Sequence, residues 1–382
     1  MHLSKKILFT LCSILIFVSV FSLSGNGLPA YKIKGVVLNS ETGAPIPLAE
    51  AFISGTTFGS ITNSEGVFEL NSSYLPCQLV VSHISYAPFS MKIDKESKSY
   101  ITVKLIPYEH EIKEITIEAR NTRRENMKLF KKAFLGMDKY ASTCSILNDS
   151  VLSFSWDSSV FSASAYQPLL IENGRLGYSI KIILNDFKLI YKPEAYKKIQ
   201  KSKRNMYDIT GAVYQMLGEF FFIPYPPGKK SKQESIARSR IAAYYGSRMH
   251  FLRSLYLGDP KEHGYDIKPD FGSVPVRGAS NLHWSGIEFI FLDPEGYPKK
   301  HMIYPEEPMM INFVKDDSGE PINLNLDKGI DLIHHQSELT FGSRKCIIRS
   351  NGTTFDYGLI FSGYIGGQRV AILLPDDFNP GD

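Results

Sequence analysis

The sequence predicts a mostly β fold of the α+β class, in which a small N-terminal β-sandwich precedes a larger, strand-rich α+β domain. Three observations support this class. Short strand-like runs follow one another between residues 31 and 107, with turn signals about every 8 to 12 residues. Longer strand-like runs and two helical patterns follow residue 121. Hydrophobic residues make up 43% of the chain and aromatic residues 12%, which excludes a disordered polymer.

Residues 1–24 have the features of a secretory signal peptide. Lys5 and Lys6 precede an apolar run over residues 7–23, and the small residue Ser24 follows it. The run is slightly long for a signal peptide, so an uncleaved membrane anchor is the alternative, because about 20 apolar residues span a bilayer. We therefore expect an exported protein.

Charge and cysteine content exclude several classes of protein. The formal net charge of +4 falls to +2 without the two lysines of the signal segment, so we expect no nucleic-acid partner and no general affinity for polyanions. Outside that segment the chain has three cysteines, Cys77, Cys144 and Cys346. Their odd number and irregular spacing fit neither a disulfide framework nor a zinc signature. One disulfide bond and three buried free thiols are both open alternatives.

Six or seven strands are expected in the sandwich, which the pattern predicts to be antiparallel. Residues 31–39 open it, and residues 59–70, "GSITNSEGVFEL", predict a hairpin of two short strands. Asn63 and Gly66 form the turn, since glycine allows a positive φ and asparagine bonds its own backbone two residues on.

Residues 34–70 resemble the carboxypeptidase regulatory-like domain, a transthyretin-like β-sandwich. The matching positions are Gly35, Val37, Gly43, Pro45, Thr62, Asn63, Gly66, Phe68 and Leu70. Asn63 stands where that family more often has aspartate. The resemblance implies an interaction module over residues 31–107 that carries no catalytic residue. The same module precedes some TonB-dependent transporters, where a segment like residues 110–121 follows it. The resemblance implies a linker over residues 108–121 here, and outer-membrane transporter machinery as a partner.

The second domain is expected to span residues 122–382 around one core, near the upper size for a single core. Residues 122–140 predict an amphipathic helix whose apolar face carries Met127, Phe130, Phe134 and Met137. Residues 233–258 predict a second helix that stops at Gly258, with an apolar face formed by Ile241, Tyr245, Met249, Leu252 and Leu255.

Four segments of this domain resemble envelope proteins of Gram-negative bacteria that carry the same sandwich. The segments are residues 168–187, 242–255, 263–267 and 367–380. The resemblance implies a place in the periplasm or at the outer membrane, and it brings no assigned activity.

A search for catalytic motifs gives no catalytic residue. His335 and Glu338 have the His-x-x-Glu spacing of two zinc ligands, but no histidine follows to supply the third, so chance explains the match better. The sequence has no Gly-x-Ser-x-Gly elbow, no Walker loop and no dinucleotide fingerprint. We expect no metal and no cofactor.

Ser247, His250 and Arg253 are the candidate binding residues. At spacings of three they line one flank of the second predicted helix, where Arg253 and His250 could bind a small anion or carboxylate. The alternative, which we favour, is structural: these side chains bond to neighbouring loops. Residues 220–230, "FFFIPYPPGKK", are expected to be a buried strand that runs into a rigid loop, with an exposed contact patch as the alternative. Residues 188–205 are basic and expected to be solvated.

The sequence therefore favours a non-enzymatic envelope protein that uses the sandwich as an interaction module and binds an envelope protein or a glycan. The competing hypothesis is an exported hydrolase of peptides or glycans, with an unrecognised site in the second domain. Converging carboxylates or a histidine in contact with a serine would favour the hydrolase.

Overall fold

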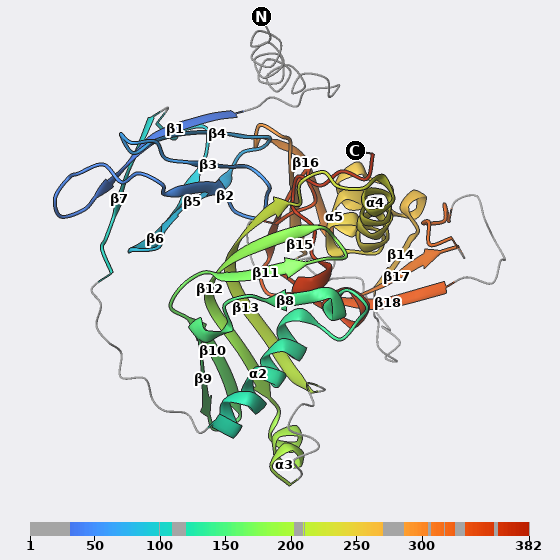
Figure 1. Cartoon of the computed structure of the whole chain (residues 1–382). Coiled ribbons are helices and arrows are strands. Elements are labelled where there is room, and N and C mark those ends of the chain that lie inside the picture. Colours follow the sequence, from blue (N-terminus) through green and yellow to red (C-terminus); the bar gives the residue numbers. More distant parts are fainter. Residues whose placement is uncertain are drawn as a thin grey trace, which may run out of the picture.

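The computed structural model describes residues 31–98, 100–108, 120–201, 209, 211–269, 286–304, 307–316, 318–324, 333–354 and 358–381. The expected signal peptide and most of the expected linker lie outside these ranges. Within them, no helix combines the length and the apolar character needed to cross a membrane. Figure 1 shows the N-terminal strands above a central sheet. Helices α4 (Lys230–Tyr244) and α5 (Arg248–Leu257) lie at the right of this view.

The N-terminal region is a β-sandwich, as predicted. Its strands are β1 (Tyr31–Asn39), β2 (Glu50–Ile53), β3 (Gly59–Ile61), β4 (Val67–Ser72), β5 (Cys77–His83), β6 (Tyr86–Ile93) and β7 (Tyr100–Leu105). One sheet has the order β4-β1-β7 and the other β3-β2-β5-β6. Alternate residues of both sheets, such as Val37, Ala51 and Leu79, fill the core between them.

The prediction of a hairpin over residues 59–70 is wrong. Strand β3 pairs with β2, whereas β4 pairs with β1, so the turn at Asn63–Gly66 joins the two sheets. Thr62 provides the physical reason, because its buried hydroxyl accepts a hydrogen bond from the N–H of Ala49 and donates one to the carbonyl of Ile46. These bonds tie the end of β3 to the chain before β2. The sandwich is also not wholly antiparallel, since β1 and β7 run parallel.

The turn itself forms as expected. Asn63 Oδ1 accepts hydrogen bonds from the N–H groups of Glu65 and Val67, at 3.0 and 2.9 Å. Gly66 has a φ of +72°, and its carbonyl accepts from the N–H of Val37 at 2.8 Å.

Gly66→Ala is expected to lower the free energy of unfolding by about 3 kcal/mol, which exceeds the loss expected for Gly43→Ala by about 1–2 kcal/mol. The alanine Cβ would lie 2.5 Å from the carbonyl oxygen of Val37, and a positive φ costs an L-residue about 1–2 kcal/mol even without a clash. Denaturant unfolding of the full chain measures the change. Gly43→Ala is the matched control for the positive φ alone, because nothing lies within 4 Å of its Cβ position. Equal losses in the two variants would contradict the role given to the close approach.

A six-stranded sheet forms the centre of the molecule. Its strands are β8 (Cys144–Ile146), β9 (Leu152–Asp157), β10 (Val160–Ala165), β11 (Leu169–Asn173), β12 (Tyr178–Tyr191) and β13 (Ala212–Pro224), with the short helix α3 (Pro193–Lys201) between the last two. Helix α2 (Arg120–Leu135) packs on one face, where Phe130 stacks on Phe134 and meets Phe187 edge-on. The helix ends at Leu135, so its predicted extension to residue 140 is wrong, and Met137 is 68% exposed rather than part of the apolar face.

The remaining strands form two smaller sheets. The first contains β14 (Tyr265–Pro269), β17 (Met309–Lys315), β18 (Ile333–Phe341) and β20 (Leu359–Ser362), and the second β15 (Ile287–Leu292), β16 (Pro298–Tyr304) and β19 (Lys345–Arg349). Helix α5 (Arg248–Leu257) packs on their core through Phe251 and Leu252. The buried residues around α5 and those around α2 form two clusters, and the partly buried Tyr245 packs against both.

The predicted helix over residues 233–258 is broken in two. Helix α4 (Lys230–Tyr244) ends at Tyr244, and α5 begins after Gly246 and Ser247. Gly246 has a φ of +77° and lies against Phe313, where a Cβ would come within 2.7 Å of the ring. The Ser247 hydroxyl accepts from the N–H of His250 and caps α5. The predicted stop at Gly258 is confirmed.

The sandwich packs closely against the C-terminal region. The outer face of β2 and β5 lies on the outer face of the six-stranded sheet, where Phe52 stacks on Phe221 with ring centroids 4.8 Å apart, flanked by Val80 and Ile183. Residues 220–224 form a strand, as expected, but only Phe222 among them is buried, and Ile223 and Pro224 are exposed. The ring of Phe221 fills the contact with the sandwich. We call this contact, together with the bonds described next, the seam.

Backbone hydrogen bonds continue across the seam. The N–H of Gly55 donates to the carbonyl of Phe220 at 2.7 Å, and the N–H of Phe222 donates to the carbonyl of Thr56 at 3.0 Å. The C-terminal segment joins them, because the N–H of Asp376 donates to the carbonyl of Gly55 at 2.7 Å. The sandwich and the C-terminal region thus share backbone pairing as well as side-chain packing.

Candidate functional site

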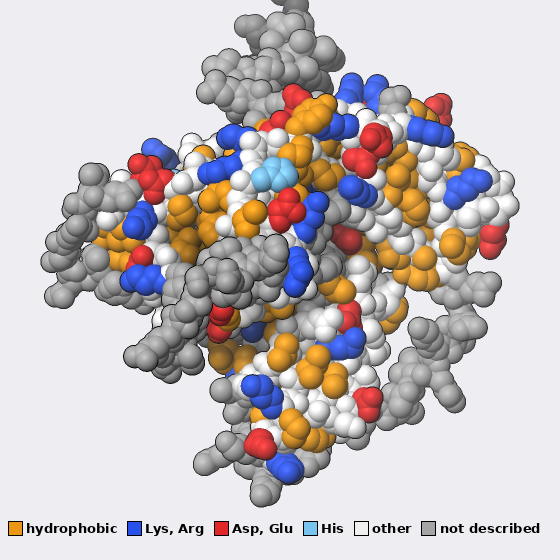
Figure 2. Space-filling model, turned by 180° about the vertical axis from the view of Figure 1, so that it is seen from behind, with side chains coloured by type: hydrophobic (Ala, Val, Ile, Leu, Met, Phe, Trp, Pro, Cys, Tyr) orange, Lys and Arg blue, Asp and Glu red, His pale blue; other side chains and the backbone are white. Residues whose placement is uncertain are grey.

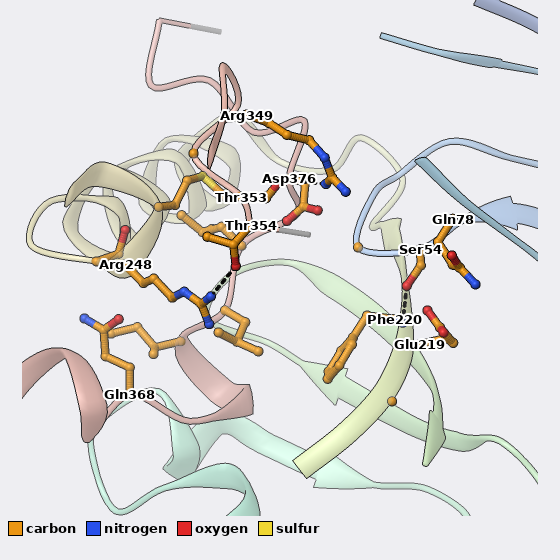
Figure 3. Close-up of a pocket in the computed structure, with 18 of the residues that line it drawn as sticks. Ser54, Gln78, Glu219, Phe220, Arg248, Arg349, Thr353, Thr354, Gln368 and Asp376 are labelled. Carbon is orange, nitrogen blue, oxygen red and sulfur yellow. Dashed lines mark hydrogen bonds between the residues drawn. The ribbon is translucent and has the colours of Figure 1, made fainter. Parts of the chain in front are cut away.

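A cavity of about 520 Å³ opens beside the seam and is the candidate site (Figure 3). Its volume lies within the range of roughly 300–1,000 Å³ that small-molecule sites occupy. The described residues that line it are Ser54, Gly55, Tyr74, Gln78, Asn185, Gly218, Glu219, Phe220, Ala243, Ser247, Arg248, Met249, Arg349, Gly352, Thr353, Thr354, Gln368, Ile372, Leu373, Leu374 and Asp376. They come from the sandwich, the central sheet, the break between α4 and α5, the chain after β19 and the C-terminal segment.

Both parts of the molecule are needed to enclose this cavity. Ser54 and Gln78 face it from the sandwich, and Glu219 and Phe220 from strand β13 (Figure 3). Asn185 lies at the point where the register of β12 and β13 shifts, a bulge that turns its side chain toward the cavity wall. A cavity made by residues from the sandwich and from the central sheet exists only while the two stay packed.

Two arginines stand on the opposite side. Arg248 is the first residue of α5, is exposed at the mouth, and donates to the Thr354 hydroxyl at 2.6 Å. Arg349, at the end of β19, is only 8% exposed and donates to the Thr353 hydroxyl at 2.8 Å. Its guanidinium also lies over the ring of Tyr74, 5.3 Å from the centroid. Figure 3 shows Arg248, Arg349, Thr353 and Thr354 on one wall of the cavity.

Asp376 lines the cavity, and the pKa of its carboxyl is raised far above the ordinary value. Burial raises its pKa to about 7, and the neighbouring charge of Asp377 adds to this, whereas the charges of Arg349 and Arg253 oppose it. The Tyr74 hydroxyl donates to Asp376 Oδ2 at 3.4 Å. Close to neutral pH, some molecules therefore carry this carboxyl in its charged form and others in its neutral form.

The three predicted binding residues do not meet in one opening. Ser247 lines the cavity but uses its hydroxyl as the helix cap. His250 is buried, and its Nδ1 lies 3.0 Å from the Tyr265 hydroxyl and accepts from the N–H of Gly246. Burial lowers the pKa of His250 to about 3, so the imidazole is neutral at physiological pH.

Arg253 is not among the described residues that line the cavity. Its guanidinium donates to the carbonyls of Asn351 and Phe378, each at 2.8 Å, and so ties the C-terminal segment to α5. These bonds to neighbouring loops are those of the structural alternative.

The zinc-like pair does not converge. His335 and Glu338 both lie on β18, where residues three apart point to opposite faces. His335 stacks on Tyr364 with centroids 4.0 Å apart, and Glu338 accepts from the Ser362 hydroxyl. Over the described ranges, no group of three or more histidine, cysteine, aspartate and glutamate side chains could hold a metal ion.

The three cysteines are free thiols in the structure, so the disulfide alternative does not hold there. Cys77 and Cys346 are buried as expected, whereas Cys144 is only partly buried. Burial raises the pKa of Cys77 to about 11 and that of Cys144 to about 12. Both are therefore protonated and poorly nucleophilic at neutral pH.

The face of the molecule shown in Figure 2 gives no competing site by charge among the residues that the structure describes. On the face shown in Figure 2, basic and acidic side chains are interspersed with apolar ones instead of forming a field of one sign. This agrees with the small net charge of the chain.

Comparison with known proteins identifies the sandwich. Residues 33–117 match the family model of the CarboxypepD_reg-like domain, which confirms the resemblance found in the sequence. None of the curated proteins matches this chain.

Two solved structures from Bacteroides show distant similarity. A Bacteroides uniformis protein suggested to bind carbohydrate is 13% identical, with a TM-score of 0.17, over 40% of this chain and 59% of its own. A Bacteroides fragilis protein of unknown function, suggested to be membrane-associated, is also 13% identical with a TM-score of 0.17, over 52% of this chain and 84% of its own. The chain thus spans less than two thirds of the first protein. Scores this low carry no argument about function.

Proposed function

We propose that this protein is a non-enzymatic binding protein of the bacterial cell envelope, and that it holds a saccharide in the cavity beside the seam. The observation that carries the proposal is the lining of the cavity. Amide and hydroxyl side chains from several elements, including Gln78, Asn185, Thr353 and Gln368, surround a space of small-molecule size. Such groups suit a ligand with many hydroxyls, since each can donate and accept hydrogen bonds.

The place in the envelope rests on the signal-like residues 1–24 and on the resemblance of the chain to envelope proteins. The sandwich forms one wall of this site, so it is a fixed part of the binding protein and not a separate, freely moving interaction module. Its other sheet, β4-β1-β7, faces away from the seam and is the surface left for an envelope protein such as a transporter.

Gln78→Trp is expected to abolish saccharide binding without unfolding the protein. Gln78 lies on the outer face of β5, and an indole there would fill part of the cavity. The full chain is titrated in a calorimeter with four saccharides, maltohexaose, xylohexaose, chitohexaose and trigalacturonate. The melting temperature of each variant is measured as well, to show that it is folded. Ser90→Trp is the matched control, because Ser90 pairs with Val80 on the neighbouring strand and is exposed outside the cavity. If no saccharide binds the wild-type protein, or if Gln78→Trp binds as well as the control, the proposal is wrong.

One observation favours the hydrolase as a second candidate. Glu219 and Asp376 line the same cavity, and the raised pKa of Asp376 is what a general acid requires. If the protein is a glycosidase, the wild type releases reducing ends from one of the four saccharides. The rate of this release is then expected to fall at least 100-fold in Asp376→Asn and in Glu219→Gln. Binding without release in the wild type supports the non-enzymatic proposal instead.

A further inference from the structure

We propose that the cavity selects a saccharide that bears a carboxylate, such as a uronic acid unit, which the side chain of Arg248 binds at the cavity mouth, on the same wall as Arg349. This inference rests on the proposed function and names the class of ligand. It starts from the unequal distribution of charge between the two walls.

The cationic wall is assembled from elements far apart in sequence. Arg248 comes from the start of α5 and Arg349 from the end of β19, and both guanidinium groups belong to the lining. Arg248 is exposed, so a ligand can reach its side chain by displacing water. Arg349 is buried and adds positive charge to the same wall. Guanidinium groups bind carboxylates in two parallel hydrogen bonds, which makes arginine suited to this recognition.

Helix α5 adds to the same potential. Its cap residue Ser247 and first two residues, Arg248 and Met249, line the cavity, so the positive end of the helix dipole faces the ligand space. The counter-charge on this wall is reduced, because burial raises the pKa of Asp376 and its carboxyl is only partly ionised near neutral pH. The second carboxylate, Glu219, stands on the opposite wall with Ser54 and Gln78 (Figure 3).

The opposite wall suits the uncharged part of such a sugar. Glu219 can accept from hydroxyl groups, and the Gln78 amide can both donate and accept. Phe220, the next residue of β13, points to the other side of the strand, so its ring lines the part of the cavity nearer to Arg248 (Figure 3). A ligand with a carboxylate at one end and hydroxyl groups at the other matches both walls.

The test compares trigalacturonate with its fully methyl-esterified form, which keeps the sugar and removes the charge. The wild-type protein is expected to bind the acid at least tenfold more tightly than the ester by calorimetry. Arg248→Gln is expected to lose at least tenfold in affinity for the acid and nothing for the ester, and Arg248→Lys is expected to recover part of the loss. Arg238→Gln is the control, since Arg238 is exposed on α4 outside the cavity.

Each outcome has a distinct meaning. Equal binding of acid and ester, or an unchanged affinity for the acid in Arg248→Gln, would overturn the inference and leave the proposed function standing. Absence of binding to trigalacturonate while a neutral hexaose binds would also overturn it alone. Absence of binding to every saccharide would overturn the proposed function as well. The melting temperature of each variant shows that it is folded.

Discussion

Phe52→Ala is expected to lower the free energy of unfolding by about 3–5 kcal/mol, the usual loss for truncating a buried phenylalanine. Phe52 is fully buried, yet it belongs to the seam and not to the sandwich core. Its removal deprives Phe221 of the ring on which it stacks and leaves a void between the two sheets. Because the cavity needs both walls, ligand binding should weaken in the same variant.

Thermal and denaturant unfolding of the full chain measure this effect. Ile61→Ala is the control, because Ile61 lies on the neighbouring strand β3 but is 61% exposed, and surface changes usually stay within about 0.5 kcal/mol. Equal small losses in the two variants would show that the seam contributes little. The sandwich would then be an independently held module.

The second large effect is a dependence of stability on pH that Asp376 causes. Its pKa is raised to about 7 in the folded protein from an ordinary value of 3.8, so between these values the folded state holds a proton that the unfolded state has lost. Stability from this group is therefore complete below about pH 4, falls as the pH rises through this window, and levels off above about pH 7. A shift of this size corresponds to a change on the order of 4 kcal/mol.

Asp376→Asn is expected to flatten this part of the profile. The amide cannot ionise, so unfolding curves from pH 4 to pH 8 should converge for the two proteins at the acid end and diverge at the alkaline end, where the variant is more stable. Asp157→Asn, at an exposed aspartate on β9, should instead follow the wild type. A variant of Asp376 that keeps the full wild-type slope would contradict the burial assigned to its carboxyl.

Sequence patterns predicted the sandwich well because its turn residues are local signals. Asn63 and Gly66 form the turn that their types require, whatever the rest of the chain does. Which strands pair was not predictable in the same way, since alternation is equally compatible with a hairpin and with a turn between sheets. The buried hydroxyl of Thr62, which decides the matter, looks like any other strand threonine in the sequence.

The sequence of β2 and β5 contains a signal for the seam that the sequence analysis did not use. In β2 and β5 apolar residues occupy both faces, with Phe52 and Val80 at positions where a half-exposed strand would be polar. A continuous apolar run of this kind indicates a strand covered on both sides. The break between the two helices was also readable, because Gly246 directly precedes Ser247, a favoured cap residue.

The candidate site had no comparable signal. Gln78, Arg248, Arg349 and Asp376 come from segments separated by up to about three hundred residues, and no motif joins them. They share a cavity because the sandwich, the central sheet and the C-terminal segment pack around it. Of the three residues that the sequence singled out, only Ser247 reaches the cavity, since a continuous helix was assumed where the chain breaks.

Hydrogen–deuterium exchange of the full chain, with and without a saturating concentration of whichever of the four saccharides binds in calorimetry, tests the central claim most directly, namely that the two regions form one ligand site. The account predicts slower exchange in both walls at once, around residues 54–57 and 74–78 of the sandwich and around residues 247–250 and 349–354 of the C-terminal region. Protection confined to one region, or no protection in either, would contradict it.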